Sequence, residues 1–208
     1  MPYLIDISNA NGPVTWSRVK DAEFVGVWLK ATEGASFIDQ MFVANRAGAK
    51  GVGLRAGAYH YARPDVNPTS PGVEADFFCS VVKKLGRTDL RPVLDLEVKA
   101  PGLEWWARQW CRAVEKRLGV FPLVYGSTAF LNKIKAKAPI GGGLWLASYG
   151  ADDGRIHVPD VPAPWKSYVA HQYTSKGKCP GVGGLVDRSY ALKLRPILAH
   201  PVLGLLSK

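Results

Sequence analysis

Apolar stretches alternate along the chain with segments whose apolar residues recur at helical spacing. The apolar stretches predict eight strands, at residues 4–8, 24–32, 55–62, 92–97, 121–127, 144–149, 168–174 and 185–190. The periodic segments predict helices at residues 16–22, 38–50, 72–85, 103–118 and 129–138, one after each of the first five strands. Only loops rich in glycine and proline separate the last three strands.

This rhythm predicts an α/β fold of the TIM-like (β/α)5(β)3 barrel type. Alternating βα units imply a parallel sheet with right-handed crossovers, and eight strands can close a barrel. A doubly wound open sheet is the alternative, but it gives no reason for the helix-free run at the end. We expect a single domain, with the barrel over residues 1–196 and a short apolar tail over residues 197–208 that packs against it.

The predicted strand at residues 92–97, PVLDLE, ends in two acids on one face. Alternation places Val93, Asp95 and Glu97 in one row and the two leucines in the other. Two carboxylates on one face repel each other and cost desolvation energy when buried. Either Glu97 marks the point where the strand reaches the surface, or the two acids are a catalytic pair at the mouth of a barrel.

Two further acids favour the catalytic interpretation. Asp6 is near the end of the first predicted strand, and Asp187 is in the last one. The first and last strands are neighbours in a closed barrel, so these two acids are expected to lie together. Asp95 and Glu97 would face them across the mouth, at the end where barrel enzymes carry their active sites. Four converging acids without a basic partner destabilise a fold unless function requires them.

Aromatic residues are expected around the same opening. Tyr59 and Tyr61 share a face of the third strand, and Trp145 and Tyr149 share a face of the sixth. Flat rings suit the apolar faces of sugars, and the Gln172 amide can hydrogen-bond hydroxyl or acetamido groups. Carboxylates with aromatic walls suggest glycoside hydrolysis, in which a protonated acid donates to the leaving oxygen. Crowding with other negative charges raises the pKa of such an acid.

Other chemistries have little support in the sequence. The four histidines form no HExxH-type site, and neither a nucleophile-elbow motif nor a phosphate-binding loop is present. Four carboxylates without a phosphate-binding motif would be an unusual magnesium site. We therefore predict no metal and no cofactor. No apolar run reaches the roughly 20 residues of a membrane span, so no stable membrane insertion is expected.

The net charge bears on which partners the protein binds, and the cysteine content on the compartment in which it is made. The net charge of +10 favours binding to a polyanion, which could be nucleic acid, an anionic membrane surface or an acidic wall polymer. The charge is scattered and no nucleic-acid-binding motif is present. Cys79, Cys111 and Cys179 are an odd number without metal spacing, so we expect reduced thiols and cytosolic synthesis, although a disulfide at Cys179 stays open. The first residues lack the features of a secretory signal.

Several motifs in order resemble those of glycoside hydrolase family 25, the Chalaropsis-type lysozymes. They are IDIS (5–8), WLKATEG (28–34), GAYHYARP (57–64), PVLDLE (92–97), LWLASY (144–149) and HQYTSKGKCPGVGGLVD (171–187). The resemblance runs from about Tyr3 to Tyr190. It implies a (β/α)5(β)3 barrel that cleaves the β-1,4 bond between N-acetylmuramic acid and N-acetylglucosamine in peptidoglycan.

The resemblance also implies roles for the acids. Glu97 would be the general acid, and Asp95 would orient or polarise the N-acetyl group of the substrate. Asp6 and Asp187 would complete an acidic floor, and Glu33 would give structural support. The residues implied to line the groove are Tyr59, Tyr61, Trp145, Tyr149 and Gln172. The chain departs from the family pattern after the last acid, where Arg188 and Ser189 follow; this bears on local hydrogen bonding or subsite preference.

The biology implied is that of a phage endolysin that acts as a monomer. It would be made in the host cytoplasm, released through a holin, and bind peptidoglycan together with anionic wall polymers. A bacterial lysozyme exported by another route is the alternative source. Two other functions stay open on the residues alone: a non-catalytic wall-binding module and a barrel glycosidase for another polysaccharide.

Overall fold

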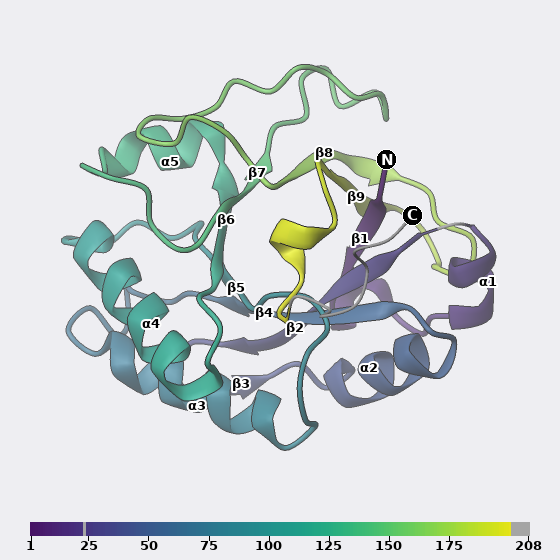
Figure 1. Ribbon diagram of the computed structural model, residues 1–208, viewed down its shortest axis with the longest axis horizontal. Coiled ribbons are helices and arrows are strands. Elements are labelled where there is room, and N and C mark those ends of the chain that lie inside the picture. Colours follow the sequence, from purple (N-terminus) through teal and green to yellow (C-terminus); the bar gives the residue numbers. More distant parts are fainter. Residues whose placement is uncertain (23, 201–208) are drawn as a thin grey trace, which may run out of the picture.

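Eight strands close into a barrel in the computed structural model, which describes residues 1–22 and 24–200 (Figure 1). They are β1 (Tyr3–Ile7), β2 (Gly26–Glu33), β4 (Arg55–Tyr61), β5 (Val93–Asp95), β6 (Leu123–Ser127), β7 (Leu144–Ala147), β8 (Ala170–Gly177) and β9 (Val186–Ala191). The barrel closes because β1 pairs with β2 on one side and with β9 on the other. The predicted TIM-like (β/α)5(β)3 barrel is confirmed.

Helices cover the first five strands and leave the last three bare, as the sequence pattern predicts (Figure 1). They are α1 (Trp16–Asp21), α2 (Phe42–Gly51), α3 (Pro71–Lys83), α4 (Leu103–Leu118) and α5 (Thr128–Ile134), with a 3-10 turn η1 (Asn9–Asn11) after β1. The helix expected at residues 38–50 begins later because β3 (Phe37–Ile38) pairs antiparallel with the end of β2. This short hairpin extends β2 beyond the barrel.

Strand β9 runs in the opposite direction to the rest of the barrel. It is antiparallel to β8 and to β1, whereas the other neighbouring barrel strands pair in parallel. The expected parallel sheet is therefore wrong for this strand, because the connection from β8 to β9, residues 178–185, is shorter than the crossover of a dozen or more residues that a parallel pair needs. The reversal places Asp187 at the start of β9, directly opposite Asp6 on β1. Both acids consequently lie at one end of the barrel.

The core has an inner and an outer part. Val93 packs inside the barrel, and Leu94 and Leu96 pack between the barrel and the helices, as the alternation predicts. Trp28 and Trp145 stack inside with ring centroids 4.3 Å apart. The large rings fill the barrel interior and form a solid base beneath the mouth.

The end of the described chain packs against the barrel end opposite the acids. The yellow segment that contains η2 (Arg195–Ile197) crosses the middle of the barrel in Figure 1. The Arg91 amide donates to the Ile197 carbonyl at 2.8 Å, and the Ile197 side chain is buried. The remainder of the predicted tail, residues 201–208, lies outside the described residues.

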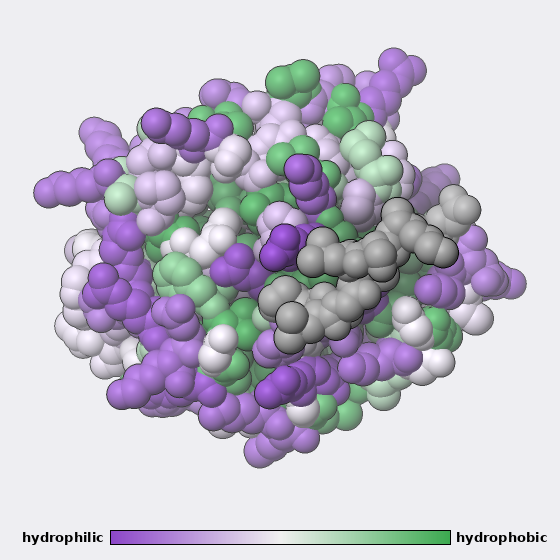
Figure 2. Space-filling model, viewed as in Figure 1, coloured by the Kyte–Doolittle hydropathy of each residue, from purple (hydrophilic) through white to green (hydrophobic). Residues whose placement is uncertain are grey.

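Hydrophilic side chains project around most of the edge of the face shown in Figure 2. None of the helices in the described ranges has the length and apolar composition needed to cross a membrane.

Cys79, Cys111 and Cys179 are buried free thiols, as expected, and burial raises the pKa of each of them.

Candidate active site

A cavity of about 230 Å³ opens at the barrel end where β1 and β5 finish and β9 begins. The residues that line it are Asp6, Ser8, Lys30, Tyr59, Tyr61, Asp95, Glu97, Tyr125, Trp145 and Asp187. The structure therefore brings all four predicted acids to one cavity, together with three of the predicted aromatic residues. Residues separated by up to about 180 positions in the chain meet here because the barrel closes between β1 and β9.

Asp95 and Glu97 differ in burial although the sequence pattern treats them as a pair. Asp95 is the last residue of β5, is only 8% exposed, and lies beside Tyr61 of β4 and Tyr125 of β6. Glu97 lies two residues beyond the strand and is exposed. The two carboxyl groups consequently occupy the wall and the rim of the cavity.

The protonation of these two groups follows from their surroundings. Burial, and then the negative charges of Glu97 and Asp6, raise the pKa of Asp95 well above its usual range. Loss of hydration at the mouth raises the pKa of Glu97, and the Lys30 ammonium opposes that rise. The Asp95 Oδ1 atom is buried and has no hydrogen-bond partner among the described residues. An unsatisfied buried acceptor of this kind suits a ligand that donates an N–H or O–H.

Asp6 and Asp187 form a second carboxyl pair on the adjacent strands. Like charges directly opposite each other in an antiparallel pair are destabilising. Burial, followed by the charge of Asp187, raises the pKa of Asp6 well above its usual range. Burial and the charge of Glu97 raise the pKa of Asp187 to about 6, although a hydrogen bond with Asp6 opposes the rise. The pair therefore holds a proton to a higher pH than two separate carboxyl groups would.

Gln172 orients this carboxyl pair from below. Its Nε2 donates to Asp6 Oδ2 at 2.9 Å, and its Oε1 accepts from the hydroxyls of Tyr125 and Tyr149 at 2.6 and 2.7 Å. Gln172 is buried, and neither it nor Tyr149 is among the residues that line the cavity. Substrate contact by these two residues stays a prediction, whereas Gln172 contacts Asp6 directly and Tyr149 reaches the acids only through Gln172.

The Trp145 ring lines the cavity as part of its buried floor. The side chain is only 2% exposed, stacks on Trp28, and packs against Tyr125 with ring centroids 4.7 Å apart. Its Nε1 donates to Ser189 Oγ at 3.0 Å. Ser189, one of the two residues that depart from the family pattern, thus supports this ring, and Arg188 lies over Tyr173 on the outer side of the strand.

The cavity lining also includes Lys30, Tyr125 and Ser8, which the sequence pattern did not predict as site residues. A signal for Lys30 was available, because it is the one cation of strand β2, follows the apolar run Val27–Leu29 and lies on the face of Trp28. Tyr125 could have been found because it lies two residues after Leu123 in the strand that follows β5, and therefore on the same inward face. Ser8 carries no such signal, because it lies at the end of β1 and caps a short turn.

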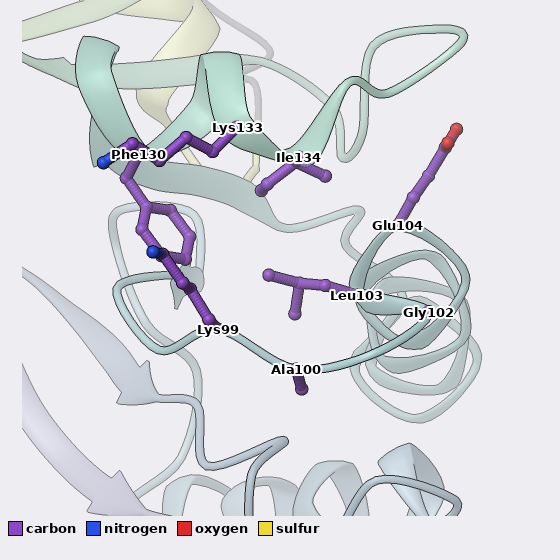
Figure 3. A pocket seen from close by; sticks show the side chains of 8 residues that line it. All are labelled: Lys99, Ala100, Gly102, Leu103, Glu104, Phe130, Lys133 and Ile134. Carbon is purple, nitrogen blue, oxygen red and sulfur yellow. The ribbon is translucent and has the colours of Figure 1, made fainter.

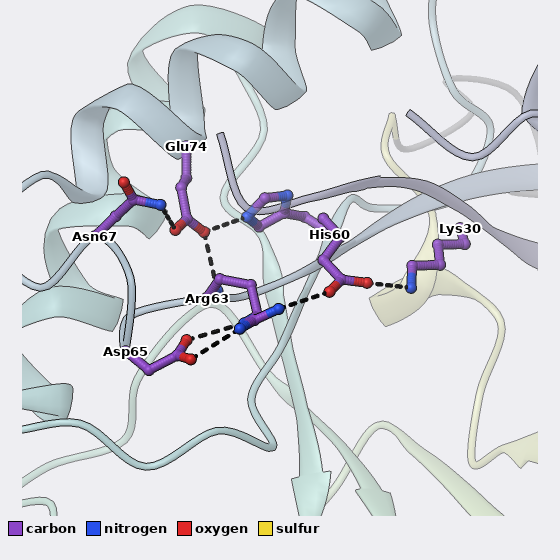
Figure 4. Close-up of polar contacts among 7 residues, drawn as sticks. Lys30, His60, Arg63, Asp65, Asn67 and Glu74 are labelled. Atoms are coloured by element: carbon purple, nitrogen blue, oxygen red, sulfur yellow. Dashed lines mark hydrogen bonds and ion pairs between the residues drawn. The ribbon is translucent and has the colours of Figure 1, made fainter. Parts of the chain in front are cut away.

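Lys30 is held by a chain of ion pairs that leads away from the cavity (Figure 4). Its Nζ lies 2.7 Å from Glu33 Oε2, and Arg63 contacts the other oxygen of Glu33 at 3.2 Å. Arg63 also binds Asp65 through both oxygens at 2.9 Å. The ammonium group lies 5.0 Å from the centroid of the Tyr61 ring, which confines it further. Glu33, predicted as structural support, thus positions the cation of the cavity.

A buried network fixes the strand that carries the two predicted tyrosines. His60 Nδ1 lies 2.8 Å from Thr32 Oγ1. His60 Nε2 lies 2.8 Å from Glu74 Oε2 (Figure 4). Burial lowers the pKa of His60, although Glu74 opposes this. The same Glu74 oxygen accepts the Arg63 amide at 3.1 Å. The network therefore joins β2, β4 and α3 directly behind the cavity wall.

The chemistry that this arrangement offers is proton transfer beside retained negative charge. Carboxyl groups with raised pKa values can donate a proton near neutral pH, and an ionised neighbour can stabilise a developing positive charge. In the described part of the chain, no group of three or more His, Cys, Asp or Glu side chains is placed to hold a metal ion.

Comparison with known proteins agrees with this geometry. The model of Glycosyl hydrolases family 25 matches residues 5–182, so the chain belongs to that family. The match includes three of the four acids and ends before Asp187.

The relatives include lysozymes and an endolysin. Lysozyme M1 of Streptomyces globisporus is 30% identical over 204 residues, which cover 89% of this chain and 66% of that protein. The crystal structure of the bacterial lysozyme from Streptomyces coelicolor is 28% identical with a TM-score of 0.75, and covers 92% of both chains. The catalytic domain of endolysin ply40 from bacteriophage P40 of Listeria monocytogenes is 26% identical with a TM-score of 0.75, covering 92% of this chain and 93% of that one.

The chain spans between about half and two thirds of the length of the curated relatives it matches. The part of the chain that matches the family lies within the barrel described above.

Proposed function

We propose that the protein is a muramidase that hydrolyses the β-1,4 bond between N-acetylmuramic acid and N-acetylglucosamine in peptidoglycan. The observation that carries this proposal is the pairing of a rim carboxyl group, Glu97, with the unpartnered Asp95 Oδ1 in one acidic cavity. Family membership and the lysozymes among the relatives support the choice of substrate.

In the proposed reaction Glu97 is the general acid. Its raised pKa favours the protonated carboxyl group, which can protonate the glycosidic oxygen as the bond to the anomeric carbon breaks. The electron pair of that bond leaves on the protonated oxygen. The Glu97 carboxylate then takes a proton from the water that completes hydrolysis.

Asp95 is proposed to position the N-acetyl group of the substrate. An acetamido N–H donates a hydrogen bond and so satisfies the buried Oδ1 atom, which holds the acetamido carbonyl toward the anomeric carbon. The carboxyl pair of Asp6 and Asp187 supplies negative charge beneath the developing oxocarbenium ion. Tyr59 and Tyr61 offer their rings to the apolar face of a sugar.

The biological role that we propose is lysis of the cell wall by a monomeric endolysin. The likeness to the phage endolysin domain, the three free thiols and the net charge of +10 support a protein that is made in a reducing cytosol, is released through a holin and binds an anionic wall. Anionic wall polymers would then be secondary ligands beside peptidoglycan.

The test is a Glu97→Gln variant assayed by clearing of purified cell walls. The substitution keeps the shape and removes the proton donor, so we expect wall clearing to fall by at least about 10²-fold. Glu115→Gln, at an exposed position of α4, is the matched control and should clear walls at the unchanged rate. Undiminished clearing by Glu97→Gln would refute the assignment, and loss in both variants would point to a general defect.

A further inference from the structure

A second, larger cavity lies at the same end of the barrel, beside the acidic one. Its volume is about 560 Å³, within the range of roughly 300–1,000 Å³ that is typical of ligand pockets. The residues that line it are Lys99, Ala100, Gly102, Leu103, Glu104, Phe130, Lys133 and Ile134. They come from the loop between β5 and α4, from the first turn of α4, and from α5 (Figure 3).

The two cavities have no lining residue in common, but adjoining segments of the chain line them. Glu97 and Lys99 are two residues apart, so their Cα atoms are separated by at most ~7 Å. Strand β6 contributes Tyr125 to the acidic cavity and passes directly into α5, which contributes Phe130 and Lys133 to the larger one. The segments that carry Glu97 and Tyr125 therefore lead directly from the acidic cavity to the lining of the larger one.

The chemistry of the larger cavity combines an apolar wall with two cations. Leu103 is buried and Phe130 and Ile134 are half-buried, whereas Lys99 and Lys133 are exposed. Both lysine side chains extend toward the end of the cavity where the Phe130 ring lies (Figure 3). Neither lysine takes part in an ion pair within the described ranges.

The one acid of the lining does not neutralise these lysines. Glu104 extends away from the cavity in Figure 3, and its Oε1 accepts from Arg108 at 2.8 Å. The same oxygen accepts the Lys137 amide at 3.1 Å. The cavity therefore presents two positive charges to a ligand, over an apolar surface.

We propose that this cavity binds the carboxylate-bearing peptide attached to the muramic acid residue, an inference that rests on the proposed muramidase function. The acidic cavity, at about 230 Å³, is smaller than the roughly 300–1,000 Å³ typical of ligand pockets, so a chain attached to a sugar bound there would extend beyond it. The peptide is linked through the lactyl group of muramic acid and so leaves the sugar next to the scissile bond. Its free carboxylates match Lys99 and Lys133, and its alanine methyl groups match the apolar wall.

The kinetic test compares two substrates prepared from one wall sample, both freed of phosphate-containing polymers. One keeps its peptides, and the other has lost them to an amidase. For K99Q/K133Q we expect kcat/KM to fall about three- to tenfold on the peptide-bearing strands and to stay unchanged on bare glycan. The matched control is K84Q/K116Q, which removes two exposed charges elsewhere and should leave both rates unchanged. Equal losses on both substrates, or no loss at all, would overturn the proposal.

Two further measurements separate this proposal from its alternatives. A loss by K99Q/K133Q that is confined to walls retaining their phosphate polymers would assign the lysines to those polymers and overturn the peptide assignment. NMR titration of Glu97→Gln with a muramyl peptide should shift the amides of Lys99 and Phe130, and free N-acetylmuramic acid should not. Because the titration needs no turnover, it decides the peptide site even if the glycan-cleaving activity is refuted; equal shifts with both ligands would contradict a peptide site.

Discussion

Replacing Asp187 by Asn should stabilise the protein at neutral pH while damaging its site. Asp187 faces Asp6 across the β1–β9 pair, and burial with nearby negative charge raises its pKa from 3.8 to about 6. One pKa unit corresponds to about 1.36 kcal/mol, so keeping this group ionised costs about 3 kcal/mol of folding free energy. The carboxyl group keeps part of its hydration, and we therefore expect a gain of ~1–3 kcal/mol at pH 7.

The stability difference between Asp187→Asn and the wild type should grow as pH rises. Because the folded state binds this proton more tightly than the unfolded state, the wild type loses stability as pH rises from about 4 through 6. Asp187→Asn lacks this titration, so the advantage of the variant should be near zero at pH 3.5 and reach its full size by pH 7. The corresponding rise in Tm at pH 7 is roughly 2–12 °C.

The assay is denaturant unfolding of both proteins at half-unit steps between pH 3.5 and 7.5. Asp160→Asn, at an exposed position, is the control and should leave the free energy of unfolding unchanged within about 0.5 kcal/mol. The reasoning is refuted if Asp187→Asn destabilises the protein at pH 7, or if its stabilisation is the same at every pH.

Two other substitutions test the surroundings of the acids. Lys30→Gln removes the cation that lowers the pKa values of Glu97 and Asp95, so the alkaline limb of the pH profile of kcat/KM should move to higher pH; a limb that stays in place would remove Lys30 from this role. Gln172→Leu deprives Asp6, Tyr125 and Tyr149 of their shared partner and should lower the free energy of unfolding by about 2–4 kcal/mol at pH 7, measured in denaturant. A loss below about 0.5 kcal/mol would show that these groups find other partners.

Most of the fold was predictable because each strand and helix has its own periodicity. The alternation in PVLDLE places Val93 and Asp95 inward and Leu94 outward, and the structure agrees. The direction of β9 was not predictable in this way, because residue alternation is the same for parallel and antiparallel strands. The later start of α2 depends on a tertiary pairing of Phe37–Ile38 with the end of β2, which local propensity does not encode.

The convergence of the four acids was predictable from barrel closure, since the first and last strands must meet. Barrel closure did not predict which side chains line the cavity and which lie behind its wall. The prediction that Gln172 and Tyr149 bind substrate gave no sign that Gln172 also holds Asp6, or that the Tyr149 hydroxyl donates to Gln172. The position of Lys30 at the mouth depends on Glu33, Arg63 and Asp65, which come from two separate segments of the chain. Side-chain networks of this kind require coordinates.

The most direct test of the central claim is the chemical nature of the ends that the enzyme creates. Purified peptidoglycan is digested, its new reducing ends are marked by borohydride reduction, and the fragments are identified by mass spectrometry. The acidic cavity with Glu97 as donor predicts reduced N-acetylmuramic acid at every new end, and none in a digest with Glu97→Gln. Reduced N-acetylglucosamine, or peptides released from intact glycan strands, would contradict the account.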